Sequence, residues 1–277
     1  MLALSLAAAA AHIPAQFAAR SSVCMCVTDA RLAANEVKCW LKDSGGTANV
    51  VVGPTAFGLG LLAPDDVNEG DIVVSVPSAC ILTTKSVENL ELSKLIDDVP
   101  EEFWAARLAL VLLAERAQGS ASSKVAHLSS LPMSYTNPIF WSPDAVGELR
   151  GYPAVQTQLL KQARFINEFA TEKLATCSSS AFGGVTVGAD GYGWAIAACS
   201  SRAISLGGQR GLVPVIDLGN HASKGVANCN VKGTLGGRVE LVANRPIALG
   251  DEITYNYGTR QPIDLKLRSA CTRCACC

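Results

Sequence analysis

Two segments of similar sequence, at 63–72 and 243–253, constrain the fold of this chain most strongly. Each contains a turn that ends in Gly-Asp before a strand-like run, at Gly70-Asp71 and at Gly250-Asp251. Neither neighbourhood contains enough strands to close a core by itself. We therefore predict one α+β fold, in which a domain of short β-strands is split by a helical insertion of about a hundred residues, rather than two tandem domains.

Local patterns on either side of the split indicate the elements. Short apolar runs bounded by Gly, Pro and Asp predict strands at 49–52, 60–63, 71–77, 238–242 and 252–257. Helical spacing and capping residues predict helices at 100–119, from Ser142 onward, at 153–175 and at 192–206. We expect the two halves of the β domain at 31–100 and 196–260, the insertion at 101–195 and a Cys-rich tail at 261–277.

The composition excludes two classes of protein. Hydrophobic residues make up 49% of the 277 residues, which is incompatible with a disordered chain. The 23 basic and 24 acidic side chains leave a net charge of −1, so there is no general excess of positive charge to bind a nucleic acid. We therefore expect no nucleic-acid partner.

The first 30 residues are predicted to be a presequence. The first acidic residue is Asp29, and Ala, Leu and Ser dominate before it, as in an organellar transit peptide. His12 and Pro14 interrupt the apolar run before it reaches the roughly 18 residues that span a bilayer, so we expect no membrane partner. The alternative for this segment is a helical N-terminal extension.

Eleven cysteines are spread unevenly along the chain, and four of them lie in the last seven residues. The odd total and the length favour buried thiols in a reducing compartment over a secreted disulfide scaffold. Because Cys276 and Cys277 are adjacent, the tail lacks the spacing of paired zinc ligands. We expect no metal site.

The segment Gly58-Leu59-Gly60 begins a G-x-G-x-x-A pattern like that of dinucleotide-binding proteins. That pattern needs a helix directly after it, whose N-terminus faces the phosphates. Here Pro64 and a turn follow, so the nucleotide interpretation is excluded. The glycines still permit close approach of the backbone to a ligand, and the alternative is a simple β-turn.

Three further segments follow in order: Ser201-Arg202-Ala203, the run from Pro214 to His221, and Tyr255-Asn256-Tyr257-Gly258. With the glycine segment they resemble a SET-domain methyltransferase, of the plastid Rubisco and aldolase lysine methyltransferase branch. The resemblance covers about residues 38–260 and includes Leu131-Pro132 and Phe140-Trp141-Ser142 within the insertion. No aromatic residue follows Tyr257 in this sequence, and we expect it to lack the C-terminal substrate-binding lobe of that branch.

The resemblance implies a role for each matching residue. S-adenosylmethionine would be bound by Gly58, Leu59, Gly60, Asn220 and His221. Arg202 and Asp217 would lie beside the substrate channel, Tyr257 would be catalytic and Tyr255 would line the channel. Taken singly, His221 could equally be a structural histidine, and the two tyrosines could be the alternating residues of any half-buried strand.

The chemistry agrees with these roles. Methyl transfer from a sulfonium to an amine is an in-line displacement that depends on alignment and exclusion of water. The amine must be neutral, and deprotonating a lysine at pH 7 costs about 4.6 kcal/mol unless burial lowers its pKa. We expect a protein-lysine N-methyltransferase in the plastid, with the cytoplasm as the alternative location. A protein-histidine methyltransferase of the same fold and a degenerate protein-binding SET module remain alternatives.

Overall fold

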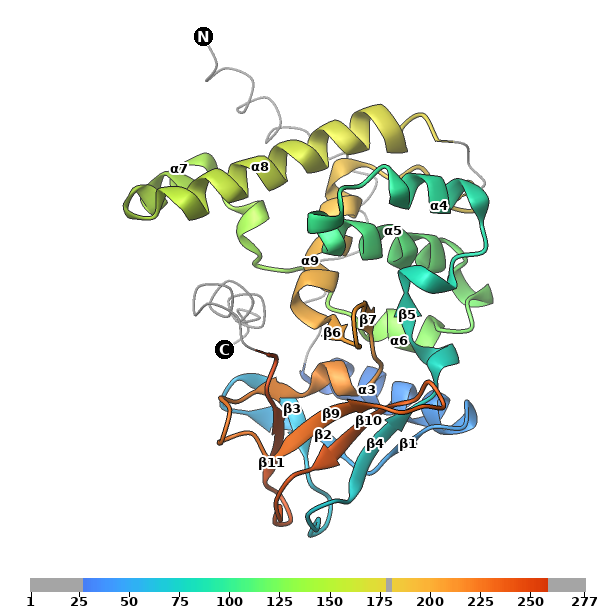
Figure 1. Cartoon of the computed structure of the whole chain (residues 1–277), viewed down its shortest axis with the longest axis vertical. Coiled ribbons are helices and arrows are strands. Elements are labelled where there is room, and N and C mark those ends of the chain that lie inside the picture. Colours follow the sequence, from blue (N-terminus) through green and yellow to red (C-terminus); the bar gives the residue numbers. More distant parts are fainter. Residues whose placement is uncertain (1–26, 178–180, 259–277) are drawn as a thin grey trace.

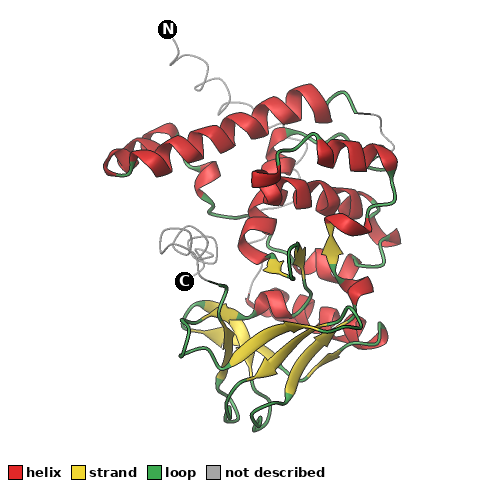
Figure 2. Cartoon of the chain, in the orientation of Figure 1, coloured by secondary structure: helices red, strands yellow, loops and turns green. Residues whose placement is uncertain are grey.

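The computed structural model describes residues 27–177 and 181–258. A β-sheet layer occupies one end of the molecule and helices occupy the other (Figures 1 and 2). The larger sheet runs in the order β1-β4-β10-β9-β11-β3-β2, with β8 paired to β11. Its strands are β1 (Thr47–Ala48), β2 (Val51–Thr55), β3 (Gly58–Leu62), β4 (Ile72–Val76), β8 (Asn220–His221), β9 (Cys229–Gly233), β10 (Val239–Ala243) and β11 (Glu252–Tyr255).

The C-terminal strands β10, β9 and β11 form the middle of this sheet, and the N-terminal strands flank them on both sides. β4 pairs with β10, and β3 pairs with β11, both antiparallel. The two similar segments also pair with each other, because Val67 and Ile247 exchange backbone hydrogen bonds of 2.8 and 2.9 Å. Gly70 and Gly250 end the two turns with φ of +92° and +84°, a conformation that favours glycine. The predicted single β domain, split in sequence, is therefore the one observed.

The helices lie mostly between the two halves of the sheet in sequence. They are α3 (Val27–Asp43), α4 (Leu90–Asp97), α5 (Trp104–Ala117), α6 (Val125–Ser130), α7 (Pro143–Gly147), α8 (Pro153–Phe169, continued by a π-turn at Ala170–Leu174) and α9 (Ala189–Arg202). A small sheet of β5 (Leu82–Thr83), β7 (Arg210–Leu212) and β6 (Ile204–Ser205) joins the layers. No helix in the described part of the chain is long and apolar enough to cross a membrane.

Two hydrophobic cores stabilise the molecule. One is formed among the helices, where α5 packs against α9 and the buried Tyr192 stacks on Phe169 with ring centroids 5.5 Å apart. The other lies under the large sheet and includes Leu41 of α3, which is fully buried. Helix α3 contacts both β1 and α6, so it connects the sheet to the helical layer.

The observed helices differ from the sequence predictions at several ends. Helix α3 begins at Val27, inside the predicted presequence of 1–30, while residues 1–26 lie outside the described part of the chain. Helix α9 ends at Arg202 rather than at residue 206, because Ile204 and Ser205 pair with β7 instead. Helix α4 precedes residue 101, so helical structure extends beyond both expected ends of the insertion.

Candidate functional site

The glycine segment begins β3, directly after the turn that joins it to β2. Gly58 and Gly60 are each needed for a different structural reason. Gly58 has φ of +101° at the tip of the β2–β3 hairpin. A Cβ atom added at Gly60 would lie 2.7 Å from Asn220 Nδ2, so a side chain there has no room. As predicted, β3 is followed by a turn and not by a helix.

Asn220 and His221 form β8, which lies parallel to β11. The buried Asn220 amide donates to Glu252 Oε1 at 2.7 Å and to Thr55 Oγ1 at 3.1 Å, so it connects β11 to the glycine hairpin. His221 Nδ1 accepts the backbone N–H of Tyr257 at 3.2 Å. Burial lowers the pKa of His221, which favours the neutral imidazole that this hydrogen bond requires.

The two tyrosines at the end of β11 lie against the same segment. Their ring centroids are 4.9 Å apart, and the ring of Tyr257 is 5.1 Å from that of His221. The hydroxyl of Tyr257 donates to the carbonyl oxygen of Gly219 at 2.6 Å. A Cβ atom at Gly219 would approach the buried Tyr255 ring to 2.9 Å, so this position also has no room for a side chain.

Arg202 and Asp217 meet on the helical side of these residues. The Arg202 guanidinium donates to the backbone oxygen of Asp217 at 3.2 Å and lies 3.9 Å from its carboxylate. Asp217 follows Val215, a buried residue with φ of +67° in a γ-turn from Pro214 to Ile216. A β-branched residue in this conformation is strained, so the surrounding core must hold the turn that presents Asp217.

The contacts therefore bring all nine predicted site residues into one cluster. The sequence analysis missed four others that contact them: Thr55 and Glu252, which hold Asn220, and His127 and Tyr135, which come from the helical insertion. Burial lowers the pKa of Arg202, but interactions with Tyr135 and Asp217 raise it by more, so the guanidinium stays charged. Only the nearby Leu131-Pro132 segment had pointed toward this part of the insertion.

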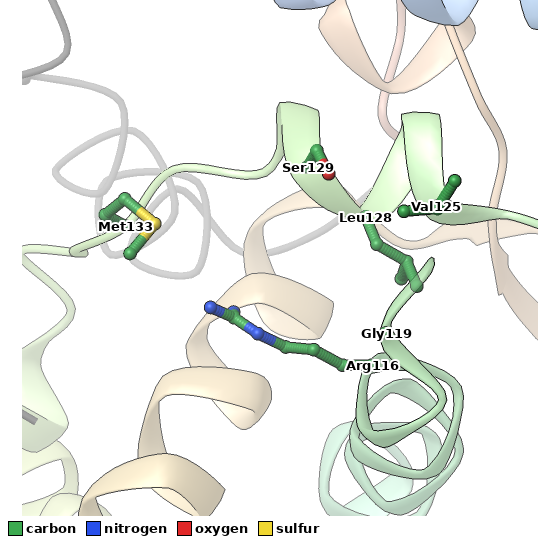
Figure 3. Close-up of a pocket in the computed structure, with 6 residues that line it drawn as sticks. All are labelled: Arg116, Gly119, Val125, Leu128, Ser129 and Met133. Carbon is green, nitrogen blue, oxygen red and sulfur yellow. The ribbon is translucent and has the colours of Figure 1, made fainter. Parts of the chain in front are cut away.

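A separate pocket of about 290 Å³ lies on the insertion (Figure 3). The side chain of Arg116 points into it from the end of α5, toward the segment that carries Met133. It is lined by Arg116, Gly119, Val125, Leu128, Ser129 and Met133. None of these residues belongs to the predicted site.

Among the described residues, the cysteine next to the tyrosines is Cys229, and it is not a reactive thiol. Cys229 pairs with Tyr255 across β9 and β11 and is fully buried, which raises the pKa of its thiol to about 12. Among residues 27–177 and 181–258, no group of three or more His, Cys, Asp or Glu side chains is arranged to hold a metal ion. The Cys-rich tail lies outside the described residues.

A split sheet whose halves meet at a glycine hairpin, an Asn-His strand and a pair of tyrosines is the architecture of a SET domain. The sequence pattern described as "SET domain" matches residues 58–258, and the chain belongs to the SET-domain family. This confirms the family resemblance and the split fold that the sequence predicts.

Proteins whose names state an activity are similar in sequence to part of this chain. The chloroplastic "[Fructose-bisphosphate aldolase]-lysine N-methyltransferase" of Arabidopsis thaliana is 29% identical over 189 residues, which cover 66% of this chain and 38% of that protein. Actin-histidine N-methyltransferase of Canis lupus familiaris is 23% identical over 252 residues, which cover 83% of this chain and 41% of that protein. The chain thus spans about two fifths of the length of these relatives.

Solved structures have the same fold. The SET domain of LSMT bound to lysine and AdoHcy aligns with a TM-score of 0.70 at 21% identity, covering 86% of this chain and 56% of that one. Rubisco LSMT bound to AdoMet aligns with the same TM-score and identity, covering 86% of this chain and 55% of that one.

Proposed function

We propose that this protein is an S-adenosylmethionine-dependent protein-lysine N-methyltransferase. The observation that carries the proposal is the continuous set of contacts from the glycine hairpin through Asn220 and His221 to Tyr257. The LSMT structures of the same fold contain AdoMet or AdoHcy. We also propose that residues 31–100 and 196–260 act as one catalytic domain around the insertion at 101–195.

The residues present fit the proposed cofactor. Gly58 leaves the tip of the hairpin without a side chain, which allows a ligand to approach the peptide groups there, whereas the space beside Gly60 is filled by Asn220, Thr55 and Glu252. When bound, S-adenosylmethionine supplies an electrophilic methyl group on a sulfonium. In this proposal Leu59 and the two glycines hold it through backbone groups, and Asn220 and His221 complete its site.

The proposed catalytic role of Tyr257 follows from its hydrogen bond. Its hydroxyl proton is donated to Gly219, so the oxygen acts toward a substrate as an acceptor that orients the amine. A phenol of ordinary pKa near 10 is protonated at neutral pH, so we assign it no general-base role. The buried ring of Tyr255 lines the channel and excludes water.

Arg202 and Asp217 are proposed to face the substrate amine. The carboxylate of Asp217 attracts a lysine ammonium to the channel. The ammonium releases a proton to water as it enters the channel, because apolar surroundings favour the neutral amine that attacks. We propose a plastid protein as substrate, because relatives that modify aldolase and the Rubisco large subunit are named chloroplastic. Protein-histidine methylation is the second candidate, since the actin-histidine relatives align over 83% of this chain.

Two experiments test the proposal. Calorimetric titration with S-adenosylmethionine should give saturable binding; no binding at millimolar cofactor would favour a degenerate protein-binding module. Incubation with radiolabelled cofactor and purified aldolase, Rubisco large subunit or actin should label one of these proteins. Mass spectrometry of the labelled peptide then distinguishes methyl-lysine from methyl-histidine.

Tyr257→Phe tests the catalytic assignment. The variant should bind the cofactor as the wild type does but lose most of its methyl transfer, by about 10²-fold or more, because a positioned hydrogen-bonding group is removed. Tyr152→Phe is the control, because Tyr152 is exposed and outside the site. Full activity of Tyr257→Phe would contradict the assignment.

A further inference from the structure

His127 is a buried histidine of the insertion that the proposed mechanism does not use. It lies on α6, and its side chain is 1% exposed. Its Nε2 atom lies 3.0 Å from Asp217 Oδ2, and the side chain of Asp217 is 2% exposed. This hydrogen bond joins residues 90 positions apart and connects the insertion to the substrate side of the site.

Asp217 needs such a partner. A carboxylate buried to this extent loses most of its hydration, and it is stable only where other groups satisfy its oxygens. Arg202 lies 3.9 Å from the carboxylate and donates a hydrogen bond to the backbone oxygen of Asp217 instead. The shorter side-chain contact of Asp217 Oδ2 is therefore the one with His127.

The other ring atom of His127 supports a defined orientation. Nδ1 is buried and has no hydrogen-bond partner among the described residues. A proton on Nδ1 would be a buried donor without an acceptor, which costs about 1–3 kcal/mol. The arrangement thus favours a proton on Nε2, where it is donated to the carboxylate.

The segment that carries His127 is fixed at several points. Ser130 Oγ donates to the backbone oxygen of His127 at 2.7 Å. Trp194 Nε1 of α9 donates to the backbone oxygen of Pro132 at 3.0 Å, and Tyr135 packs against the Trp194 ring. Since Tyr135 also interacts electrostatically with Arg202 and raises its pKa, the segment from His127 to Tyr135 acts on both members of the Arg202–Asp217 pair.

We propose that His127 is a positioning residue of the substrate channel. It donates Nε2–H to Asp217 and holds the carboxylate in the orientation in which it receives the substrate ammonium. This inference rests on the proposed function, in which Asp217 faces the amine. It adds that the insertion contributes to substrate affinity through this hydrogen bond.

A pair of matched variants tests the role. His127→Gln can place its amide nitrogen near the position of Nε2, whereas His127→Asn is shorter and cannot reach Asp217. Two titrations are followed by ligand-observed NMR. AdoHcy is added to the protein alone, and free L-lysine is added to the protein saturated with AdoHcy. We expect His127→Asn to weaken lysine binding about tenfold or more, with His127→Gln within about threefold of wild type and AdoHcy affinity unchanged in both.

Leu128→Ala is the structural control, because Leu128 is buried in the same helix and its apolar side chain cannot hydrogen-bond Asp217. It should lower the melting temperature and leave lysine affinity unchanged. Lysine binding by His127→Asn equal to wild type would overturn the inference. Wild-type protein that binds neither AdoHcy nor lysine would instead contradict the proposed function.

A measurement on the wild type covers the case in which the His127 variants do not fold. Nitrogen-15 NMR of labelled histidine, with the His221 signals assigned from His221→Gln, should show the His127 ring protonated at Nε2, with a slowly exchanging ring N–H signal that Asp217→Asn shifts. A His127 ring protonated only at Nδ1, or a ring signal that Asp217→Asn does not change, would overturn the inference.

Discussion

Two of the three glycines at the site are explained by the absence of space for a side chain rather than by flexibility. Gly60 and Gly219 have ordinary backbone angles, yet a Cβ atom at either would lie within 3.0 Å of a side chain of the cluster. Gly58 differs, because its φ of +101° disfavours any other residue. Two glycines therefore set how closely the strands approach, and the third forms the turn.

Gly60→Ala should disturb the cofactor site. The added methyl group would displace Asn220, Thr55 or Glu252, and such overpacking costs about 1–3 kcal/mol. We expect S-adenosylmethionine affinity, measured by calorimetry, to fall about tenfold or more. Gly191→Ala is the matched control, because it lies in α9 with no atom near its Cβ position and should be neutral or stabilising. Unchanged affinity in Gly60→Ala would contradict the role of this close approach.

Acid should destabilise the fold through His221. Its pKa is lowered in the folded state, so below its ordinary value of 6.5 the unfolded chain binds more protons than the folded chain. Stability is therefore complete above about pH 6.5 and is lost as the pH falls below it. Urea denaturation at pH 7.5 and 5.5 should show a larger loss for wild type than for His221→Gln. Equal losses would show that His221 does not titrate in this way.

The site could be predicted from the sequence only where its residues lie in ordered motifs. The motifs include Arg202, Asp217 and Tyr257. They omit four residues that contact the predicted site: His127, Tyr135, Thr55 and Glu252. His127, Thr55 and Glu252 hydrogen-bond residues 90, 165 and 32 positions away, and no local spacing indicates such a partner.

Helices and strands were predictable to different degrees. The cap at Ser142 was recognised, and its hydroxyl accepts the N–H of Ala145 at 3.3 Å. Helix α3 was missed although Ala34, Val37 and Leu41 are buried at helical spacing, because its first residues were assigned to a presequence. The end of α9 was missed because strand pairing with β7, a tertiary contact, ends the helix.

Trp194→Phe should loosen the contact between α9 and the segment after α6. The change removes the hydrogen bond to Pro132 and weakens the interaction with Arg116, whose guanidinium carbon lies 4.2 Å from the ring centroid. We expect a loss of about 1 kcal/mol in the free energy of unfolding, measured in urea. Trp141→Phe, at a more exposed position, should change stability by less than about 0.5 kcal/mol. Similar losses in both variants would contradict the specific role of Trp194.

The molecule as a whole is held together by pairing between its two sequence halves. Val67 and Ile247 pair across the two similar turns, and both side chains belong to the core under the sheet. The similarity of these two turns is visible in the sequence, but their pairing with each other could not be predicted from it. This pairing depends on the topology of the sheet, which no local sequence pattern specifies.

A double-mutant cycle tests this pairing. Val67→Ala and Ile247→Ala should each destabilise the protein, and we expect a coupling energy of about 0.5–1 kcal/mol between them, measured in urea. Val67→Ala combined with Leu112→Ala of the helical core should be additive within about 0.5 kcal/mol. Additivity in both cycles would contradict a direct contact between the two turns.

Because the sheet is split in sequence, strands that pair with each other are synthesised at widely separated times. Strand β4 leaves the exit tunnel about 160 residues before its partner β10 leaves it. At ordinary synthesis rates of about 5–20 residues per second, that is a wait of roughly 8–30 s. During this interval β3 and β4 expose unpaired edges, which are templates for aggregation. We therefore expect the nascent chain to depend on chaperones, and the insertion to fold before the sheet that encloses it in sequence.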